Sequence, residues 1–262
     1  MFEMNYAYTC FQPILKCLPT TMELTFAAVL LALIGGILLS FGVKCRNRLV
    51  NIIFSILNSF LKGIPILVFL YVFNNSIDDI MTGLSGIFGF TYNIRRSPTF
   101  AFAVLAMAMS YAPYMCDMIV SAYDTVPKGQ KEACDAFGFT GWQTMRRIVI
   151  PQMTVIALPN FGNHFVNLLK ATSLTCMVTI MEMMGAARNY ATLNQRFLET
   201  YVICALLYWG IFLIFEQLFR LLEKKTGRYL EPSLAIKKRK RRLLRMIKGL
   251  NNDYSDGERV KA

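Results

Sequence analysis

The chain has 262 residues, of which 55% are hydrophobic and only 17% are charged. Soluble domains carry about a quarter charged residues, so the composition excludes an ordinary soluble domain and predicts a polytopic membrane protein. The formal net charge is +12, and the tail Arg220–Ala262 carries most of the excess, with 14 Lys or Arg against 5 Asp or Glu. The apolar blocks run for about 20 residues or more without period-two alternation, which predicts an all-α fold.

Residues 1–19 form a short lead-in of mixed composition, and Thr20–Val43 is the first predicted membrane helix. Three basic residues, Lys44, Arg46 and Arg48, directly follow this apolar run. Loops on the cytoplasmic side of a membrane are enriched in lysine and arginine. The loop after the first span is therefore predicted inside, and the N-terminus outside.

The second apolar block is Leu49–Asn75. Pro65 interrupts it and predicts a kink or a turn, because proline removes a backbone hydrogen-bond donor. The crossing part is then Pro65–Phe73 with the turn or two before it. Asn74–Pro98 is predicted as an outside loop with room for a short interfacial helix, and Thr99–Val126 is the third span, which returns the chain to the cytoplasm.

A polar segment then separates two apolar blocks, and its residues predict a helix, a break and a second helix. Pro127 is suited to the start of the first helix, and Gly138 permits the positive φ that ends it. The second helical piece, Trp142–Ile148, is expected to stop before Pro151, because the residue before a proline disfavours helical geometry. The alternation of the predicted spans places this segment on the cytoplasmic side.

The fourth apolar block is Pro151–Met184, with the span itself nearer Phe161–Ile180. Gly185–Glu199 is predicted as a second outside loop, and Thr200–Leu222 as the fifth span. The basic tail, 223–262, then returns inside, where it is held near anionic lipid. The prediction is therefore a membrane protein of five transmembrane helices, with the N-terminus outside and the C-terminus in the cytoplasm.

The polar segment between the third and fourth spans resembles the EAA loop of ABC importer permeases. The resemblance lies in Glu132-Ala133, in Gly138 five residues later, and in Ile148 and Pro151 after a gap of nine residues. In that family the loop, here 127–151, is a cytoplasmic coupling helix that fits a groove on the ATP-hydrolysing subunit. The residues that this resemblance assigns to coupling with the ATPase subunit are Glu132, Ala133, Cys134, Gly138, Ile148 and Pro151.

Further stretches are similar to the polar amino acid branch of the same family, and together they cover residues 20–220. They are Thr20–Thr25, Phe60–Val68, Tyr114–Asp117, Val126–Ala133 and Leu169–Leu174. The resemblance implies a five-span permease domain at 20–222 and the import of a polar or sulfur-containing amino acid. Residues that depart from the usual pattern are Ile64, Phe69, Asp117, Val120, Cys134 and Ala171. Several departures remove polar groups from the spans, so another small solute, such as an osmolyte or methionine, stays open.

Four polar residues in the predicted spans are candidates for the translocation pathway. Asp117 and Lys170 are ionisable, and a charge inside a membrane usually faces a partner or a water-filled path. Thr172 and Ser173 can hydrogen-bond a solute, or they can bond across helices or to their own backbone. The single histidine, His164, lacks identifiable carboxylate neighbours in the sequence and is assigned to packing.

No catalytic set or metal-ligand cluster is predicted, and the seven cysteines form no C-x-x-C pair. The chain also has no G-x-x-x-x-G-K-[ST] phosphate loop, so ATP and Mg are expected on a partner subunit. The resemblance implies two ATPase subunits, a second permease copy or a paralogue, an extracellular solute-binding protein, and the bacterial plasma membrane. The basic run Lys237–Arg242 has no interleaved aromatic residues, so we expect membrane lipid and no nucleic acid as its partner. A non-transporting membrane anchor or scaffold is the alternative from another class.

Overall fold

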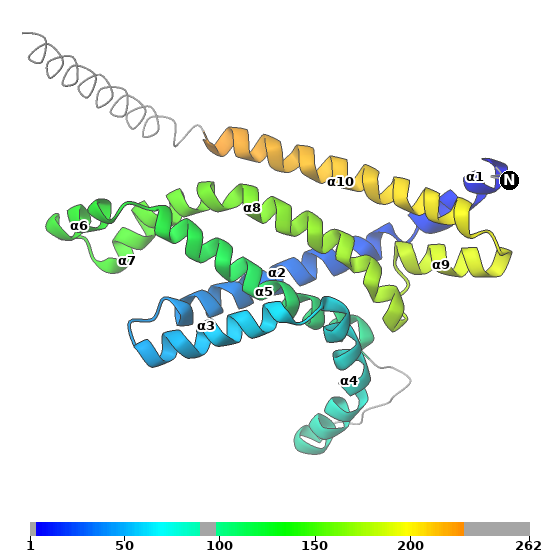
Figure 1. The fold of residues 1–262 in the computed structure, drawn as a ribbon, viewed down its shortest axis with the longest axis horizontal. Coiled ribbons are helices and arrows are strands. Elements are labelled where there is room, and N and C mark those ends of the chain that lie inside the picture. Colours follow the sequence, from blue (N-terminus) through cyan, green and yellow to red (C-terminus); the bar gives the residue numbers. More distant parts are fainter. Residues whose placement is uncertain (1–3, 90–97, 228–262) are drawn as a thin grey trace, which may run out of the picture. The chain divides into compact units, whose positions relative to one another are not determined.

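The computed structural model describes residues 4–89 and 98–227, and every regular element in that part of the chain is a helix (Figure 1). The predicted all-α class is therefore confirmed for the described residues. The chain divides into two compact units, Met1–Phe219 and Arg220–Ala262, and the features below belong to the first. The basic run Lys237–Arg242 lies outside the described residues.

Two long helices, α2 (Leu18–Val43) and α5 (Thr99–Thr125), pack along each other and nearly coincide with the first and third predicted spans. The side of α2 that faces α5 carries small residues at a spacing of four, including Ala28, Ala32 and Gly36, and all three are buried. Small residues let helix backbones approach closely inside a membrane, where lipid removes the hydrophobic drive for packing. The large apolar side chains that α2 exposes include Phe26, Leu30, Leu38 and Phe41.

The second apolar block is broken into α3 (Arg48–Gly63) and α4 (Ile66–Phe88), which meet at an angle of 94°. Pro65 is the N-cap of α4, a position where its missing N–H leaves no hydrogen bond unmade within the helix. The predicted interruption at Pro65 is therefore confirmed, and the chain turns there by about a right angle.

The helix α4 extends well into the segment predicted as an outside loop. It runs to Phe88 and ends where Gly89 adopts a φ of 71°. Isoleucines and leucine recur at helical spacing beyond the first half of the helix, at Ile77, Ile80 and Leu84, so the apolar periodicity carries the helix onward. The loop prediction is wrong for residues 74–88, and residues 90–97 lie outside the described part of the chain.

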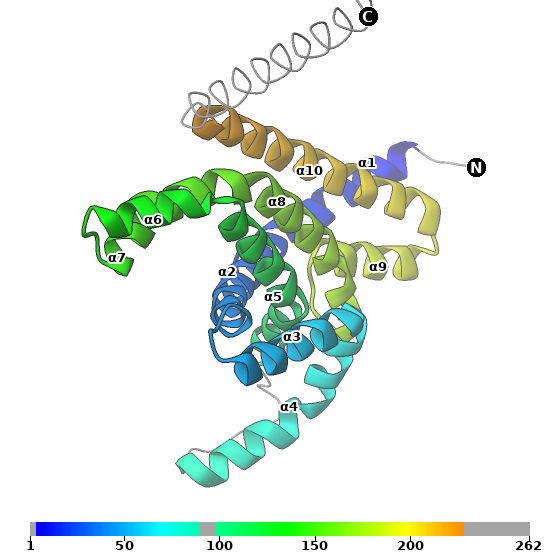
Figure 2. The same ribbon diagram turned by 60° about the vertical axis from the view of Figure 1, so that its left-hand side comes forward.

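Two further predicted irregular segments contain helices, α1 (Met4–Leu15) in the lead-in and α9 (Met183–Asn194) in the second outside loop. They pack together with the first turns of α10 (Phe197–Gly227), burying Cys10 and Ile14 of α1. Short helices are stabilised mainly by such tertiary packing, which is why their local sequence signals were weak. Both views place α1 and α9 at the opposite end of the unit from α6 and α7 (Figures 1 and 2).

The fourth apolar block forms α8 (Ile150–Ala171) followed by a tighter 3₁₀ helix, η3 (Thr172–Val178). The axis then bends by 48° before α9 begins. Within the described residues three helices, α2, α5 and α10, are each long and apolar enough to cross a membrane. The number of candidate spans rises to five if each bent pair, α3 with α4 and α8 with α9, counts as one.

Candidate functional site

The segment predicted to couple begins with a short helix, α6 (Lys128–Ala136), whose N-cap is Pro127 as predicted. At its other end Gly138 has a φ of 75°, the left-handed conformation that glycine adopts without steric cost. The Phe139 N–H then donates to the Cys134 carbonyl at 3.0 Å, which satisfies one of the last carbonyls of the helix. The prediction that Gly138 ends this helix is confirmed.

The two faces of α6 differ in exposure. Glu132 and Ala133 are exposed to solvent, and Phe137 at the end of the helix is 82% exposed. Cys134 faces the other way and is 6% exposed. It lines a recess of about 320 Å³ together with the half-buried Ile148. Ala133 and Phe137 line the same recess, and Cys134 is the buried residue of α6, while Glu132 and Ala133 remain accessible.

The second helical piece does not stop before Pro151, so that prediction is wrong. It begins as α7 (Gly141–Thr144), where Thr140 and Gln143 form a reciprocal capping box, and it continues through a π turn, η2 (Met145–Val149), into α8. Pro151 is exposed in the first turn of α8. The π turn shifts the hydrogen-bond register by one residue, which accommodates both the missing N–H and the ring of the proline.

Two side-chain contacts join α6 to the long helices. The Lys131 ammonium lies 3.5 Å from the centroid of the Tyr123 ring at the end of α5, within the range of a cation–π interaction. The Gln152 side-chain amide of α8 donates to the Gln130 Oε1 of α6 at 2.8 Å. Because α6 is attached to both α5 and α8, it cannot shift without changing contacts to either helix.

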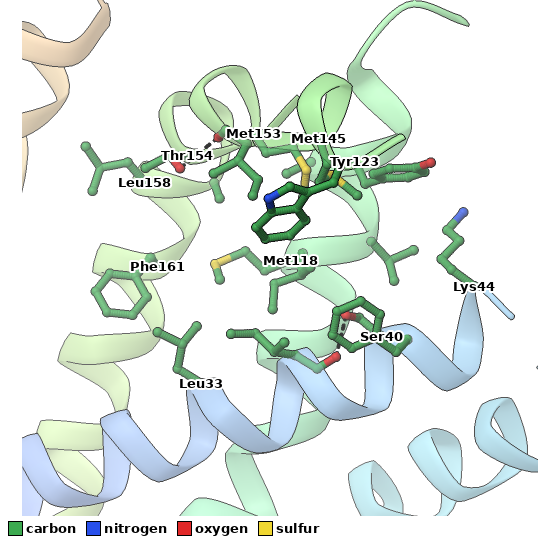
Figure 3. Close-up of a pocket in the computed structure, with 18 of the residues that line it drawn as sticks. Leu33, Ser40, Lys44, Met118, Tyr123, Met145, Met153, Thr154, Leu158 and Phe161 are labelled. Atoms are coloured by element: carbon green, nitrogen blue, oxygen red, sulfur yellow. Dashed lines mark hydrogen bonds between the residues drawn. The ribbon is translucent and has the colours of Figure 1, made fainter. Parts of the chain in front are cut away.

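An apolar groove of about 920 Å³ lies between α2, α5, α7 and α8 (Figure 3). Leu33 and Phe161 lie toward one end of it, and Lys44 lies toward the other. The hydroxyls of Ser40 and Thr154 in its walls donate to carbonyls of their own helices at 2.7 and 2.9 Å. The lining of the groove is therefore mostly apolar, and its other polar side chains are Lys44, Tyr123 and Trp142.

The candidate pathway residue Asp117 is paired across helices. The Lys62 ammonium lies 2.6 Å from its Oδ2, and the Asn58 side-chain amide donates to its Oδ1 at 2.9 Å. Asn58 and Lys62 are four residues apart on α3, so both face the same carboxylate. Such pairing is expected of charges inside a membrane. The sequence analysis did not identify Lys62 as the partner, although Asn58 and Lys62 are two polar residues four positions apart in one helix, which was a usable signal.

Lys170, Thr172 and Ser173 lie where α8 passes into η3. The Lys170 ammonium lies 4.6 Å from the centroid of the Phe212 ring on α10, so Asp117 and Lys170 have different partners and do not pair with each other. The Thr172 and Ser173 hydroxyls each donate to the carbonyl three residues earlier, at 2.7 and 2.8 Å. Both hydroxyls therefore bond to their own backbone, one of the alternatives that the sequence left open.

The sequence matches the family described as "Binding-protein-dependent transport system inner membrane component" over residues 28–228. The chain belongs to this family. The permease is 30% identical over 226 residues to the probable amino-acid permease protein YxeN of Bacillus subtilis (strain 168), a match that covers 86% of this chain and 96% of the relative. It is 32% identical over 224 residues to the L-cystine transport system permease protein TcyL of the same organism, covering 86% and 91%.

The fold of the permease also matches a solved structure described as "Crystal structure of an amino acid ABC transporter with histidines". The TM-score is 0.72 at 24% sequence identity, and the match covers 86% of this chain and 99% of that one. At this identity the likeness supports the fold alone.

Within residues 4–89 and 98–227 of the permease, no three His, Cys, Asp or Glu side chains are grouped as metal ligands would be. The His164 ring lies beside the ring of Tyr114, with centroids 6.1 Å apart, which agrees with its assignment to packing. The described residues supply a charged pair between two helices and an exposed helix, α6, that contacts α5 and α8.

Proposed function

We propose that this permease forms half of the translocation pathway of an ATP-driven importer for a polar or sulfur-containing amino acid. The solute class is supported by the two Bacillus subtilis relatives, one a probable amino-acid permease and the other a permease for L-cystine. The charged pair Asp117 and Lys62 supplies one group of each sign for a zwitterionic solute, and Lys170, Thr172 and Ser173 are the further candidate contacts.

Coupling to ATP hydrolysis is assigned to the loop from Glu132 to Pro151. The observation that supports it is that α6 exposes Glu132 and Ala133, while Gln130 and Lys131 attach the helix to α8 and α5. Two ATPase subunits, which bind ATP and Mg, dock on this exposed face. A second permease copy or a paralogue completes the pathway, and an extracellular solute-binding protein delivers the solute.

Purification of the tagged permease in mild detergent tests this assignment. The native chain is expected to bring down an ATPase subunit, and the double variant Glu132→Lys/Gly138→Val is expected to lose it. Gly129→Ala is the matched control, because Gly129 lies in α6 with nothing within 4 Å of an added Cβ. Recovery of the ATPase with both variants alike, or with neither variant nor the native chain, would count against the coupling assignment and favour a membrane anchor.

Five spans with the N-terminus outside are also proposed, supported by the two bent helix pairs and by the separation of α1 and α9 from α6 and α7. Cysteines at the two ends of α2 provide a test, because Cys17 and Cys45 are both half-buried free thiols. In single-cysteine variants, a membrane-impermeant maleimide is expected to label Cys17 in spheroplasts and Cys45 only after permeabilisation. Labelling of Cys45 in spheroplasts, with Cys17 labelled only after permeabilisation, would show the opposite orientation.

The labelling rate of Cys17 is expected to depend on pH. Burial, with a contribution from the negative charge of Glu182, raises the pKa of the Cys17 thiol above its ordinary value. The reactive species is the thiolate, so the labelling rate of Cys17 increases with pH up to the raised pKa. We therefore expect faster labelling at pH 8.5 than at pH 7, and a rate that does not change with pH would contradict the buried environment of this thiol.

The solute itself is tested by competition. Uptake of radiolabelled L-cystine into cells that express the complete importer is expected to be inhibited by unlabelled L-cystine and by other polar amino acids. Methionine and glycine betaine are included as probes of the alternative solute classes. Inhibition by methionine or betaine alone would replace the proposed solute while leaving the permease assignment intact.

A further inference from the structure

The carboxylate of Glu182 lies fully buried between η3 and α9, and no role was assigned to it from the sequence. Its Oε1 accepts the Gly185 N–H at 2.9 Å. Its Oε2 accepts the Tyr208 hydroxyl of α10 at 2.6 Å and lies 3.5 Å from the Thr21 hydroxyl of α2, which also has the Cys17 carbonyl at 3.3 Å. One acidic side chain therefore contacts polar groups of three helices.

These contacts are concentrated where the fourth apolar block is most irregular. The chain leaves the 3₁₀ helix η3 through Thr179, whose φ of 67° is uncommon for a threonine, and then bends by 48°. Glu182 is the N-cap of α9 and so supplies the acceptor that the first turn of the new helix requires. The Cβ of any residue replacing Gly185 would lie 2.7 Å from the Ile180 carbonyl oxygen, so the bend is also tightly packed.

The segment that ends at Glu182 begins at the candidate pathway residues. Thr172, the first residue of η3, is fully buried, and its hydroxyl donates to the Leu169 carbonyl at 2.7 Å. The next residue along η3, Ser173, is only half-buried. The segment from Thr172 to Glu182 is therefore fastened near both ends, while Ser173 remains on its more accessible side.

We propose that Glu182 is a positioning residue of the permease: by binding Tyr208 and Thr21, its carboxylate fixes the segment that carries Ser173 relative to α2 and α10. A buried polar network of this kind holds one geometry when all its members are satisfied. The inference rests on the proposed transport function, because the segment is a candidate wall of the pathway. It assigns no solute contact to Glu182 itself.

A carboxylate suits this site better than an amide, because both of its oxygens act as acceptors. In Glu182→Gln the remaining oxygen can keep the Gly185 N–H, and the new NH₂ group then faces the Tyr208 hydroxyl, which must turn its proton away. Tyr208→Phe removes the same contact from the other side. Tyr201→Phe is the matched control, since it deletes a hydroxyl two turns earlier on α10 that takes no part in the described hydrogen bonds of Glu182.

The test measures initial uptake rates of radiolabelled L-cystine, or of the panel amino acid that the native importer transports, in proteoliposomes containing the ATPase. Glu182→Gln and Tyr208→Phe are each expected to raise the KM for the solute by roughly three- to tenfold, with a smaller change in maximal rate. The double variant is expected to be no worse than either single variant, because both substitutions alter the one contact between Glu182 and Tyr208.

Two results would overturn the proposal. One is a wild-type KM in both single variants, and the other is a lower thermal stability of the variants with no change in KM, which would make the network purely structural. Purification of each variant with its ATPase separates this outcome from failure of the proposed function. A variant that co-purifies with the ATPase but has a raised KM supports the positioning role. A native chain that recovers no ATPase contradicts the importer assignment itself.

Discussion

Valine in place of Gly138 is expected to abolish solute uptake by the assembled importer while the variant still accumulates in the membrane. Gly138 has a φ of 75°, and a β-branched residue is strongly disfavoured there. No atom lies within 4 Å of an added Cβ, so the effect comes from the backbone and not from a clash. The left-handed conformation costs an ordinary residue about 1–2 kcal/mol, and valine more.

The strain is relieved by redirecting the chain after α6. The hydrogen bond from the Phe139 N–H to the Cys134 carbonyl is then lost, and with it the fixed end of α6. Uptake and ATP hydrolysis are measured together in proteoliposomes, and we expect hydrolysis to persist without transport. Gly129→Ala should retain both activities, since alanine is favoured over glycine in a helix. Normal uptake by the Gly138 variant would contradict a mechanical role for this turn in transport.

The second large effect is expected at Gly36, where α2 meets α5. A Cβ at this position would lie 2.5 Å from the Met115 Cβ and 2.9 Å from the Cys116 backbone nitrogen. Backbone atoms cannot move aside as a flexible side chain does, so the two helices must separate. We expect Gly36→Ala to destabilise the permease by about 1–3 kcal/mol, and Gly36→Leu to prevent its accumulation in folded form.

The measurement is the temperature at which half of the detergent-solubilised protein remains monodisperse on size-exclusion chromatography. Gly210→Ala is the control, because Gly210 lies on the candidate span α10 with nothing within 4 Å of an added Cβ. A Gly36→Ala protein as stable as this control would mean that the close approach of α2 and α5 does not hold in the membrane.

Much of the helix pattern was accessible from composition and spacing. Thr20–Val43 and Thr99–Val126 were placed within two residues of α2 and α5, because a long apolar run with polar ends leaves little freedom in its limits. Gly138 was assigned as a helix end for a local steric reason, and the structure confirms it. Such features depend on the residue and its immediate neighbours.

The errors occurred where stability comes from distant contacts. The short helices α1 and α9 hold each other against α10, so neither is evident from its own sequence. Pro151 was expected to end a helix, because a proline breaks a regular α-helical register. A single π turn before it shifts that register, so the helix continues through the proline.

The pairing of side chains between helices was decided by the tertiary structure. Asp117 was recognised as an intramembrane charge, yet its partner Lys62 lies 55 residues away on α3. Glu182 meets Tyr208 and Thr21 only because α2, α9 and α10 converge. A helix that is apolar on every side does not reveal which face turns inward, and the rotation of each span is set by how its small and large residues fit the neighbouring helices. The class of the protein and the hypothesis that its loop 127–151 couples to an ATPase follow from the chain alone, whereas the partners of its buried charges follow from that packing.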